Sequence, residues 1–268
     1  MKLRIFGILA AILSIAFSNA HCAAPTAEQV DKWKKDAASG KSDGQYNLGI
    51  LNELGLGMPK NLAEALKLYR LAANQGDVRA QVSIGWMYEN GVGLGRNYDE
   101  ALTWYRKAAE KNYSSAQYHI GSMYENGLGV LKNIAEAVKF YQLAADQGDP
   151  RAQVSLGAKY ELGWGVSQSY RDALKWYRMA ADRKDAAGQY SVGNMYELGF
   201  GVTQDYAGAL KWYRLSAAQG YGPAQYLIGD MYENGRGVKK DLTEAKKWYR
   251  KSCDRGEKLG CLKYRQMN

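Results

Sequence analysis

A 36-residue period runs through the sequence and restricts its fold more than any other feature. Gln, Gly and Tyr each recur six times at this interval, and no insertion breaks the register. The recurring residues are Gln45, Gln81, Gln117, Gln153, Gln189 and Gln225; Gly49, Gly85, Gly121, Gly157, Gly193 and Gly229; and Tyr69, Tyr105, Tyr141, Tyr177, Tyr213 and Tyr249. Such self-similarity is typical of stacked supersecondary units, each of which buries its apolar face against the next.

The second half of each repeat carries the start and stop signals of a helix. Residues of N-cap type recur at one position, and an acidic residue follows three positions later in most repeats, close to the capping-box spacing. Gly208 takes that place in the fifth repeat and predicts a weaker start there. Gly or Asn then supplies a left-handed C-cap, a pattern that Lys184 breaks. The N-cap residues are Asn61, Asn97, Asn133, Ser169, Asp205 and Asp241.

The first half of each repeat predicts another helix, which runs from about Ala80 to Asn90 in the second repeat. Gln81, Ile84, Gly85 and Tyr88 recur with the 3-, 4- and 7-residue spacing of one helical face. Gly inside a helix costs about 1 kcal/mol relative to Ala. Six such glycines predict that a neighbouring helix packs where a Cβ would lie.

A recurring Glu lies near the C-terminal end of each first helix, where the helix dipole disfavours negative charge. We expect a partner for each carboxylate, either backbone N–H groups of the following Gly-x-Gly turn or a nearby Arg. Acid–base chemistry would need one unlike pair, whereas these six are alike. The residues are Glu53, Glu89, Glu125, Glu161, Glu197 and Glu233.

Both ends of the repeat array match half of a repeat. Residues 27–39 align with a second helix, and residues 257–267 align with a first helix in which Arg265 replaces the recurring Gly. Capping helices with polar outer faces are typical of repeat proteins. We therefore predict an all-α fold over 27–267, a right-handed α-solenoid of six 36-residue helix-turn-helix repeats with a capping half-repeat at each end.

Residues 1–20 have the pattern of a secretory signal peptide, with a basic start, an apolar run and small residues before a cut after Ala20. Residues 21–26 would form a leader. A lipid anchor on Cys22 normally needs a Leu-small-small run before it, so we favour an unmodified leader thiol. No later segment has 18 consecutive apolar residues, which predicts no transmembrane segment. The mature protein is expected in the periplasm or outside the cell.

The composition argues against an enzyme or a metalloprotein. The chain has 2 His and 3 Cys, too few for a polyhistidine or four-cysteine metal centre. One Gly-x-Ser-x-Gly match, at 40–44, follows a predicted helix rather than the strand of a nucleophile elbow, so we interpret it as a turn. We expect no catalytic residue, no metal and no cofactor.

The residues at 81–93 (Gln-Val-Ser-Ile-Gly-Trp-Met-Tyr-Glu-Asn-Gly-Val-Gly), followed by Ala-Leu-Thr-Trp-Tyr-Arg-Lys-Ala-Ala at 101–109, resemble the Sel-one-like repeat family. This family is related to tetratricopeptide repeats, and the resemblance covers residues 27–267. It implies a non-enzymatic scaffold that binds another protein, as an extended segment or helix, through a concave face. The cysteine-rich branch of the family implies an alternative, the binding or hydrolysis of β-lactams or peptidoglycan fragments.

In tetratricopeptide-like folds the first helices line the concave face, so their variable positions are candidate contacts. Positions equivalent to Ser83, Trp86 and Asn90 share one helical stripe, which we call the variable stripe. An exposed Trp86 would be a typical interface anchor, although it could instead pack on its neighbours. The predicted partner-binding residues are Trp86, Ser83, Asn90, His119, Ser122, Asn126, Asn194 and Asp230.

Cys253 and Cys261 replace other residues at recurring positions at the last helix junction. Their spacing resembles that of the disulfides in the cysteine-rich branch. We hypothesise a disulfide that holds the C-terminal cap, with two free buried thiols as the alternative.

Basic residues recur along the predicted second helices, and we call this row the basic ribbon. It could bind an anionic envelope or host polymer; nucleic acid is not expected for an exported chain. The lysines also follow acidic residues by three positions, as ordinary helix-surface ion pairs do. The ribbon contains Lys67, Lys139, Lys175, Lys211 and Lys247, with Arg70, Arg106, Arg178, Arg214 and Arg250.

Overall fold

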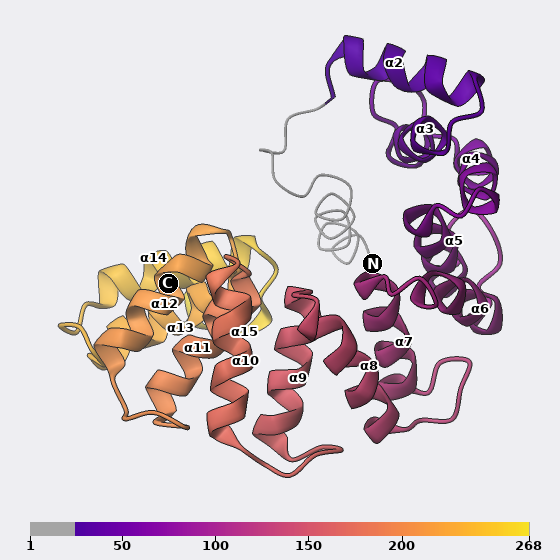
Figure 1. Ribbon diagram of the computed structural model, residues 1–268. Helices are drawn as coiled ribbons and strands as arrows, with labels where there is room; N and C mark the ends of the chain where they lie inside the picture. Colours follow the sequence, from indigo (N-terminus) through magenta and orange to yellow (C-terminus); the bar gives the residue numbers. More distant parts are fainter. Residues whose placement is uncertain (1–24, 268) are drawn as a thin grey trace. The chain divides into compact units, whose positions relative to one another are not determined.

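The computed structural model describes residues 25–267, and all regular secondary structure in this range is α-helical. The predicted signal peptide, most of the leader and Cys22 lie outside the described residues. Each of the six repeats contains two helices of 12 or 13 residues, as the periodicity predicts (Figure 1). The chain is thus an all-α repeat protein of the α-solenoid class.

The helices keep the same bounds relative to the 36-residue period. The first helices are α3 (Ser42–Leu54), α5 (Val78–Asn90), α7 (Ser114–Asn126), α9 (Pro150–Leu162), α11 (Ala186–Leu198) and α13 (Gly222–Asn234). The second helices are α4 (Leu62–Asn74), α6 (Tyr98–Ala109), α8 (Ile134–Asp146), α10 (Tyr170–Asp182), α12 (Tyr206–Ala218) and α14 (Leu242–Asp254). The terminal helices are α2 (Ala27–Ala38) and α15 (Lys258–Gln266).

The described residues form two compact units, which divide the sequence between Tyr113 and Ser114, a boundary between repeats. The first contains α2 to α6, and the second contains α7 to α15. Within each unit the two helices of a repeat pack on each other, and each second helix packs on the first helix of the next repeat. In the second unit the first helices α9 and α11 also touch directly.

The recurring glycines allow the two helices of each repeat to approach closely. A Cβ built on Gly121 would lie 2.8 Å from two ring carbons of Tyr141, and the other five repeats place the same Tyr ring against the same Gly. These distances are shorter than real Cβ contacts, so only Gly fits. The predicted close packing is confirmed, and the nearest atoms in each repeat belong to the aromatic ring.

The predicted caps define the ends of the second helices. All six N-cap side chains accept a backbone N–H, including that of Asp205, which bonds the N–H of Gly208 at 2.9 Å. Left-handed residues with φ between 57° and 87° follow the helices. Lys184 departs from the residue pattern but keeps this conformation at φ 62°, as does Asn112 at 57°. A lysine thus occupies a backbone position that favours glycine.

A second periodicity, of two repeats, governs side-chain contacts near the ends of the second helices. In the first, third and fifth repeats a Gln here donates to the recurring Gln of its own repeat, as Gln75 does to Gln45 at 2.8 Å. In the second, fourth and sixth repeats the equivalent residue is basic and reaches back to the glycine that caps the preceding second helix. Lys111 donates to the Gly76 carbonyl at 2.9 Å, and the guanidinium groups of Arg183 and Arg255 lie against Gly148 and Gly220.

The C-terminal junction contains the predicted disulfide. Cys253 on α14 and Cys261 on α15 are joined, with their Cα atoms 4.4 Å apart. No helix among the described residues is long and apolar enough to cross a membrane.

Candidate functional site

One polar arrangement recurs along the first helices and borders the variable stripe. The Tyr that packs on the recurring Gly donates its hydroxyl to the recurring Glu, which lies one helical turn after that Gly. The pairs are Tyr69–Glu53, Tyr105–Glu89, Tyr141–Glu125, Tyr177–Glu161 and Tyr213–Glu197 at 2.6 Å, and Tyr249–Glu233 at 2.5 Å. The expected partner of each Glu, a backbone N–H group or an Arg, is therefore wrong in kind: a phenol donates to all six, and Glu197 has an Arg, Arg236, in addition.

Burial changes the pKa values of several residues in these Tyr–Glu pairs. Burial, followed by the neighbouring carboxylate, raises the pKa of the Tyr69, Tyr141, Tyr177 and Tyr213 phenols above the ordinary value, so each stays a hydrogen-bond donor. Burial also raises the pKa of Glu53, which is 5% exposed. The pKa of Glu233 is lowered instead, first by the Tyr249 hydrogen bond and then by Lys263.

In the second unit, three of these carboxylates also hold a cation that follows them in sequence. Lys159 on α9 pairs with Glu125, and Lys263 on α15 lies 2.9 Å from Glu233. Arg236, in the turn after α13, lies 2.8 Å from Glu197. Lys159 is unusual because it occupies a buried first-helix position that is Met or Leu in the other repeats. Lys159 was not among the residues predicted from the sequence, although a single charged residue at an otherwise apolar position is a visible signal.

The predicted site residues of the first unit lie on α5. Ser83 and Trp86 are half-buried, and Trp86 packs against the apolar cluster around Ile84 and Met87. Asn90 is exposed and donates its side-chain amide to the Trp86 carbonyl at 2.9 Å. Trp86 is therefore partly engaged in packing and only partly exposed.

The predicted site residues of the second unit are engaged to different degrees. His119 and Ser122 are half-buried on α7, and Asn126 is exposed and donates to the Ser122 carbonyl at 2.8 Å. The Tyr213 hydroxyl, which donates to Glu197, also lies 2.7 Å from the side-chain oxygen of Asn194, and Asp230 pairs with Arg236. Asn194 and Asp230 thus connect the variable stripe to the Tyr–Glu pairs, a link that the linear spacing did not reveal.

The basic ribbon is exposed on the second helices, and part of its charge is internally paired. Lys139 and Lys247 lie 2.6 Å from Glu136 and Glu244, and Lys67 lies 3.3 Å from Glu64. Arg178 donates to the Tyr196 hydroxyl at 2.7 Å, and Arg214 donates to that of Tyr232 at 3.0 Å.

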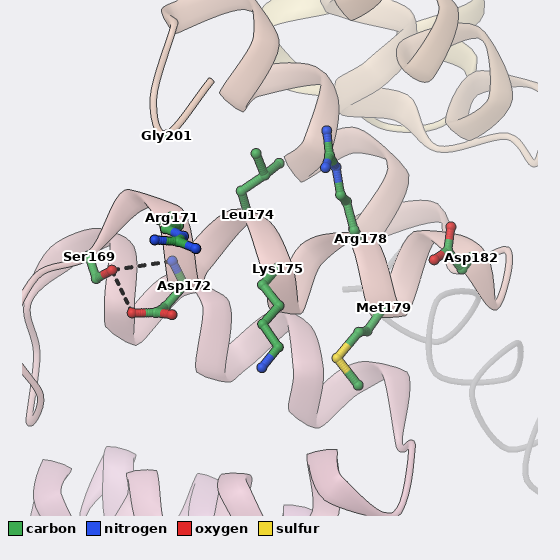
Figure 2. Close-up of a pocket in the computed structure, with 9 residues that line it drawn as sticks. All are labelled: Ser169, Arg171, Asp172, Leu174, Lys175, Arg178, Met179, Asp182 and Gly201. Carbon is green, nitrogen blue, oxygen red and sulfur yellow. Dashed lines mark hydrogen bonds between the residues drawn. The ribbon is translucent and has the colours of Figure 1, made fainter. Parts of the chain in front are cut away.

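An open depression of about 890 Å³ lies over the ribbon on α10 (Figure 2). Arg171, Lys175 and Arg178 line it together with Asp172 and Asp182. Figure 2 shows Lys175 and Arg178 pointing to opposite sides of the helix, so their charges do not converge on one point.

Among residues 25–267, no group of three or more His, Cys, Asp or Glu side chains is placed to hold a metal ion. Ser42, the serine of the Gly-x-Ser-x-Gly match, is the first residue of α3 and follows the turn after α2. The first helices thus present a chemically varied surface on a regularly repeated set of helix contacts.

Comparison with known proteins gives the same repeat boundaries. The family model described as Sel1 repeat matches residues 42–77, 78–113, 114–149, 150–185, 186–221 and 222–257. No curated protein matches the sequence.

Several solved structures are similar. The chain is 36% identical to c5321 from uropathogenic Escherichia coli, a protective antigen with an SLR fold, at a TM-score of 0.74 over 88% of this chain and 50% of that one. It thus spans half of the length of that structure. It is 34% identical to a Sel1 repeat protein from Oxalobacter formigenes, also at a TM-score of 0.74, over 81% of this chain and 86% of that one. The immunity protein PA5088 from Pseudomonas aeruginosa, 23% identical, shares the fold at a TM-score of 0.54 over 84% of this chain and 81% of that one.

Proposed function

Because the chain belongs to the Sel1 repeat family, we propose that it is an exported, non-enzymatic scaffold that binds another protein through the variable stripe of its first helices. The observation that carries this proposal is the contrast between neighbouring positions on the same helices. The Gly, Tyr and Glu residues that join the two helices are the same in every repeat. At the Trp86 position, directly after the recurring Gly and one turn before the Glu, the side chain differs in every repeat: Ile, Trp, Ser, Ala, Asn and Asp.

This contrast separates the recurring residues, which join the helices, from the variable stripe, which forms the proposed binding surface. The recurring residues are used in packing, so they leave no freedom to choose a partner. In the second to sixth repeats the residues of the variable stripe are half-buried or exposed, whereas Ile50 in the first repeat is buried in the core. A rigid frame also lowers the entropic cost of binding, because the contact residues are already ordered. An extended segment or a helix of the partner would match a row of such positions.

The disulfide supports export. Disulfides persist in oxidising compartments and are rare in a reducing cytosol. A Cys253–Cys261 bond therefore agrees with the signal peptide proposed for residues 1–20 and with a periplasmic or secreted location.

Site-specific photo-crosslinking tests the proposal. Benzoylphenylalanine would be introduced in producing cells at Trp86, Ser122 and Ala158 of the variable stripe, and at Lys139 and Lys175 on the second helices as controls. We expect one dominant protein adduct from the stripe positions, reproduced with the purified partner, and none from the controls. Adducts from the second helices alone would mean that the proposed face is wrong.

The basic ribbon supports a second candidate function, the binding of an anionic envelope or host polymer. Its observation is the row of exposed lysines and arginines along the second helices, three of which line the depression on α10 together with two aspartates. Electrostatic binding of this kind weakens steeply with added salt. Loss of polymer binding on changing Lys175 and Arg178 to Gln, together with a steep salt dependence, would favour this function. Turnover of a chromogenic β-lactam by the purified protein would identify the third alternative, the β-lactam or peptidoglycan-fragment activity.

A further inference from the structure

Glu161 differs from the other recurring glutamates of the second unit because it lacks a cation. Its Oε2 accepts the Tyr177 hydroxyl at 2.6 Å, and its backbone carbonyl accepts from Gln168 at 2.8 Å. Its Oε1 has no hydrogen-bond or ion-pair partner among residues 25–267, and it is not among the buried unpartnered atoms there. One oxygen of a half-buried carboxylate therefore remains open to solvent.

The sequence explains why no internal cation reaches this carboxylate. The three cations of the second unit follow their glutamates by three different distances: 34 residues for Lys159, 39 for Arg236 and 30 for Lys263. Applied to Glu161, the same three distances lead to Met195, Phe200 and Ser191. Met195 is buried, and Phe200 stacks on Tyr170 with ring centroids 4.3 Å apart. Each of the three positions that could neutralise Glu161 thus carries an uncharged residue.

The surroundings of Glu161 are apolar and open on the variable stripe. Asn194, at the equivalent place one repeat later, hydrogen-bonds Tyr213, so this stripe position borders the Tyr–Glu pair. In the fourth repeat it is Ala158, whose methyl group can make no such bond. Leu162 and Leu198, at the ends of α9 and α11, are 50% and 54% exposed. An open carboxylate whose next residue in the chain is an exposed leucine is complementary to a basic side chain with apolar neighbours.

We propose that Glu161 is the recognition site for a lysine or arginine side chain of the partner protein, whose apolar neighbouring residues contact Leu162 and Leu198. This inference rests on the proposed function and specifies the chemistry of the partner at one repeat. The incoming ammonium or guanidinium group would occupy the place that Lys159, Arg236 and Lys263 fill at their own glutamates. The partner would thus complete a Tyr–Glu–cation arrangement that the chain builds by itself in three other repeats.

A peptide experiment with internally matched variants tests this. A positional-scanning library of acetylated, amidated decapeptides is selected on the purified mature protein, and the best peptide is measured by fluorescence anisotropy. We expect Lys or Arg at one position between apolar residues. Glu161→Gln, which keeps the Tyr177 hydrogen bond, should weaken that peptide about tenfold, the effect of losing one charge-assisted hydrogen bond.

Two further variants supply the cation from within the chain. Met195→Lys copies the Lys159 arrangement, and Phe200→Arg copies that of Arg236; each should weaken the peptide about tenfold by occupying Glu161. Met231→Lys is the matched control, because it follows Glu197 by the same 34 residues but Glu197 already holds Arg236. It should leave the affinity within twofold of the wild type. Phe200 lies in a turn, so Phe200→Arg can still be measured if the buried variants Met195→Lys and Met231→Lys do not fold.

The outcomes separate this inference from the proposed function. A selected peptide without a basic residue, or one whose affinity Glu161→Gln leaves unchanged, overturns the cation site, while photo-adducts at the variable stripe would still support protein binding. Failure of the library to yield any peptide also counts against the cation site. Absence of both peptides and photo-adducts overturns the proposed function as well.

Discussion

The hydroxyl of Tyr69 donates a 2.6 Å hydrogen bond to the carboxylate of Glu53, which is 5% exposed. The ring of the same Tyr fills the space above Gly49. One side chain therefore closes the contact between two helices and provides the partner of a buried charge, and the same arrangement recurs in all six repeats. Its energetic weight should differ between repeats, because the glutamates differ in burial and in their other partners.

Removing the hydroxyl should destabilise the protein most where Glu has no strong second partner. Tyr69→Phe leaves Glu53 without its hydrogen-bond donor, which should lower the free energy of unfolding by about 1–3 kcal/mol. Tyr249→Phe should lower it by about 1 kcal/mol or less, because Glu233 keeps Lys263 at 2.9 Å. Urea unfolding followed by circular dichroism measures both. Equal losses would show that the cation does not compensate for the phenol.

The pH dependence of stability should have opposite signs at these two glutamates. Burial raises the pKa of Glu53 in the folded state, so the native protein binds this proton more tightly and stability falls as pH rises through that pKa. Glu53→Gln should therefore raise the melting temperature at about pH 7.5 and change it little at about pH 4.

The Tyr249 hydrogen bond and Lys263 lower the pKa of Glu233, so its contribution is present above its ordinary value and is lost as pH falls through the folded-state pKa. Glu233→Gln should lower stability at about pH 7.5, by about 1 kcal/mol or less, and the difference should vanish in acid. Melting curves between pH 3.5 and 8 compare the two variants. The same sign for both would contradict the assigned causes.

A methyl group at the helix contact should be destabilising. Gly121→Ala places a Cβ 2.8 Å from the Tyr141 ring and 3.2 Å from the Ala137 carbonyl, so the helices must separate. We expect a loss of about 1–3 kcal/mol, as for other overpacked sites. Gly95→Ala is the control, because a Cβ there meets nothing within 4 Å and should change stability by less than about 0.5 kcal/mol. Similar values for the two variants would mean that the second unit absorbs the added methyl.

Lys184 offers a stabilising substitution. It is exposed and holds a left-handed backbone with φ 62°, which costs a non-glycine residue about 1–2 kcal/mol. Lys184→Gly should raise the free energy of unfolding by about 1 kcal/mol. Gly148→Ala, at φ 85° in the equivalent place of the preceding repeat, should lower it. A loss of stability in Lys184→Gly would indicate that the lysine side chain makes a stabilising contact.

Reduction of the disulfide should act locally. The bond closes a loop of about nine residues, which corresponds to about 2–3 kcal/mol in the chain-entropy model. Replacing both Cys253 and Cys261 by Ser should therefore speed amide hydrogen exchange throughout α15 while leaving α7 to α12 unchanged. Peptide mapping without reductant checks the bond itself, and an unlinked pair would reject it.

The sequence was sufficient for the helices, their caps and the Gly contact because each is coded by residues close in sequence or repeated at one interval. Asn61 begins a helix by bonding a backbone N–H three residues later, and Gly121 marks a close approach simply by lacking a Cβ. The signal peptide and the modification of Cys22 remain predictions.

The side chains that contact the recurring glutamates could not be predicted from the sequence in the same way. The Tyr hydroxyl that reaches Glu161 lies 16 residues away, and the helix dipole gave no reason to prefer it over a backbone group. The cations come from three different positions, so no single spacing reveals them. Glu161 occupies the same repeat position as the other glutamates, so the repeat pattern does not distinguish it. It differs because Met195, Phe200 and Ser191 carry no charge where other repeats supply a cation.

The alternation between Gln and basic residues at the ends of the second helices limits how such a chain can change in length. Gln147 donates to Gln117 within its own repeat, while the Arg183 guanidinium lies against Gly148, the glycine cap of the preceding repeat. Two consecutive repeats are therefore the smallest unit that contains both kinds of contact. Loss or duplication of one repeat would bring two like partners together. A recombination event that preserves every junction must therefore add or remove two 36-residue repeats, or 72 residues, at a time. Artificial arrays built from this chain should therefore be cut at the boundaries between double repeats.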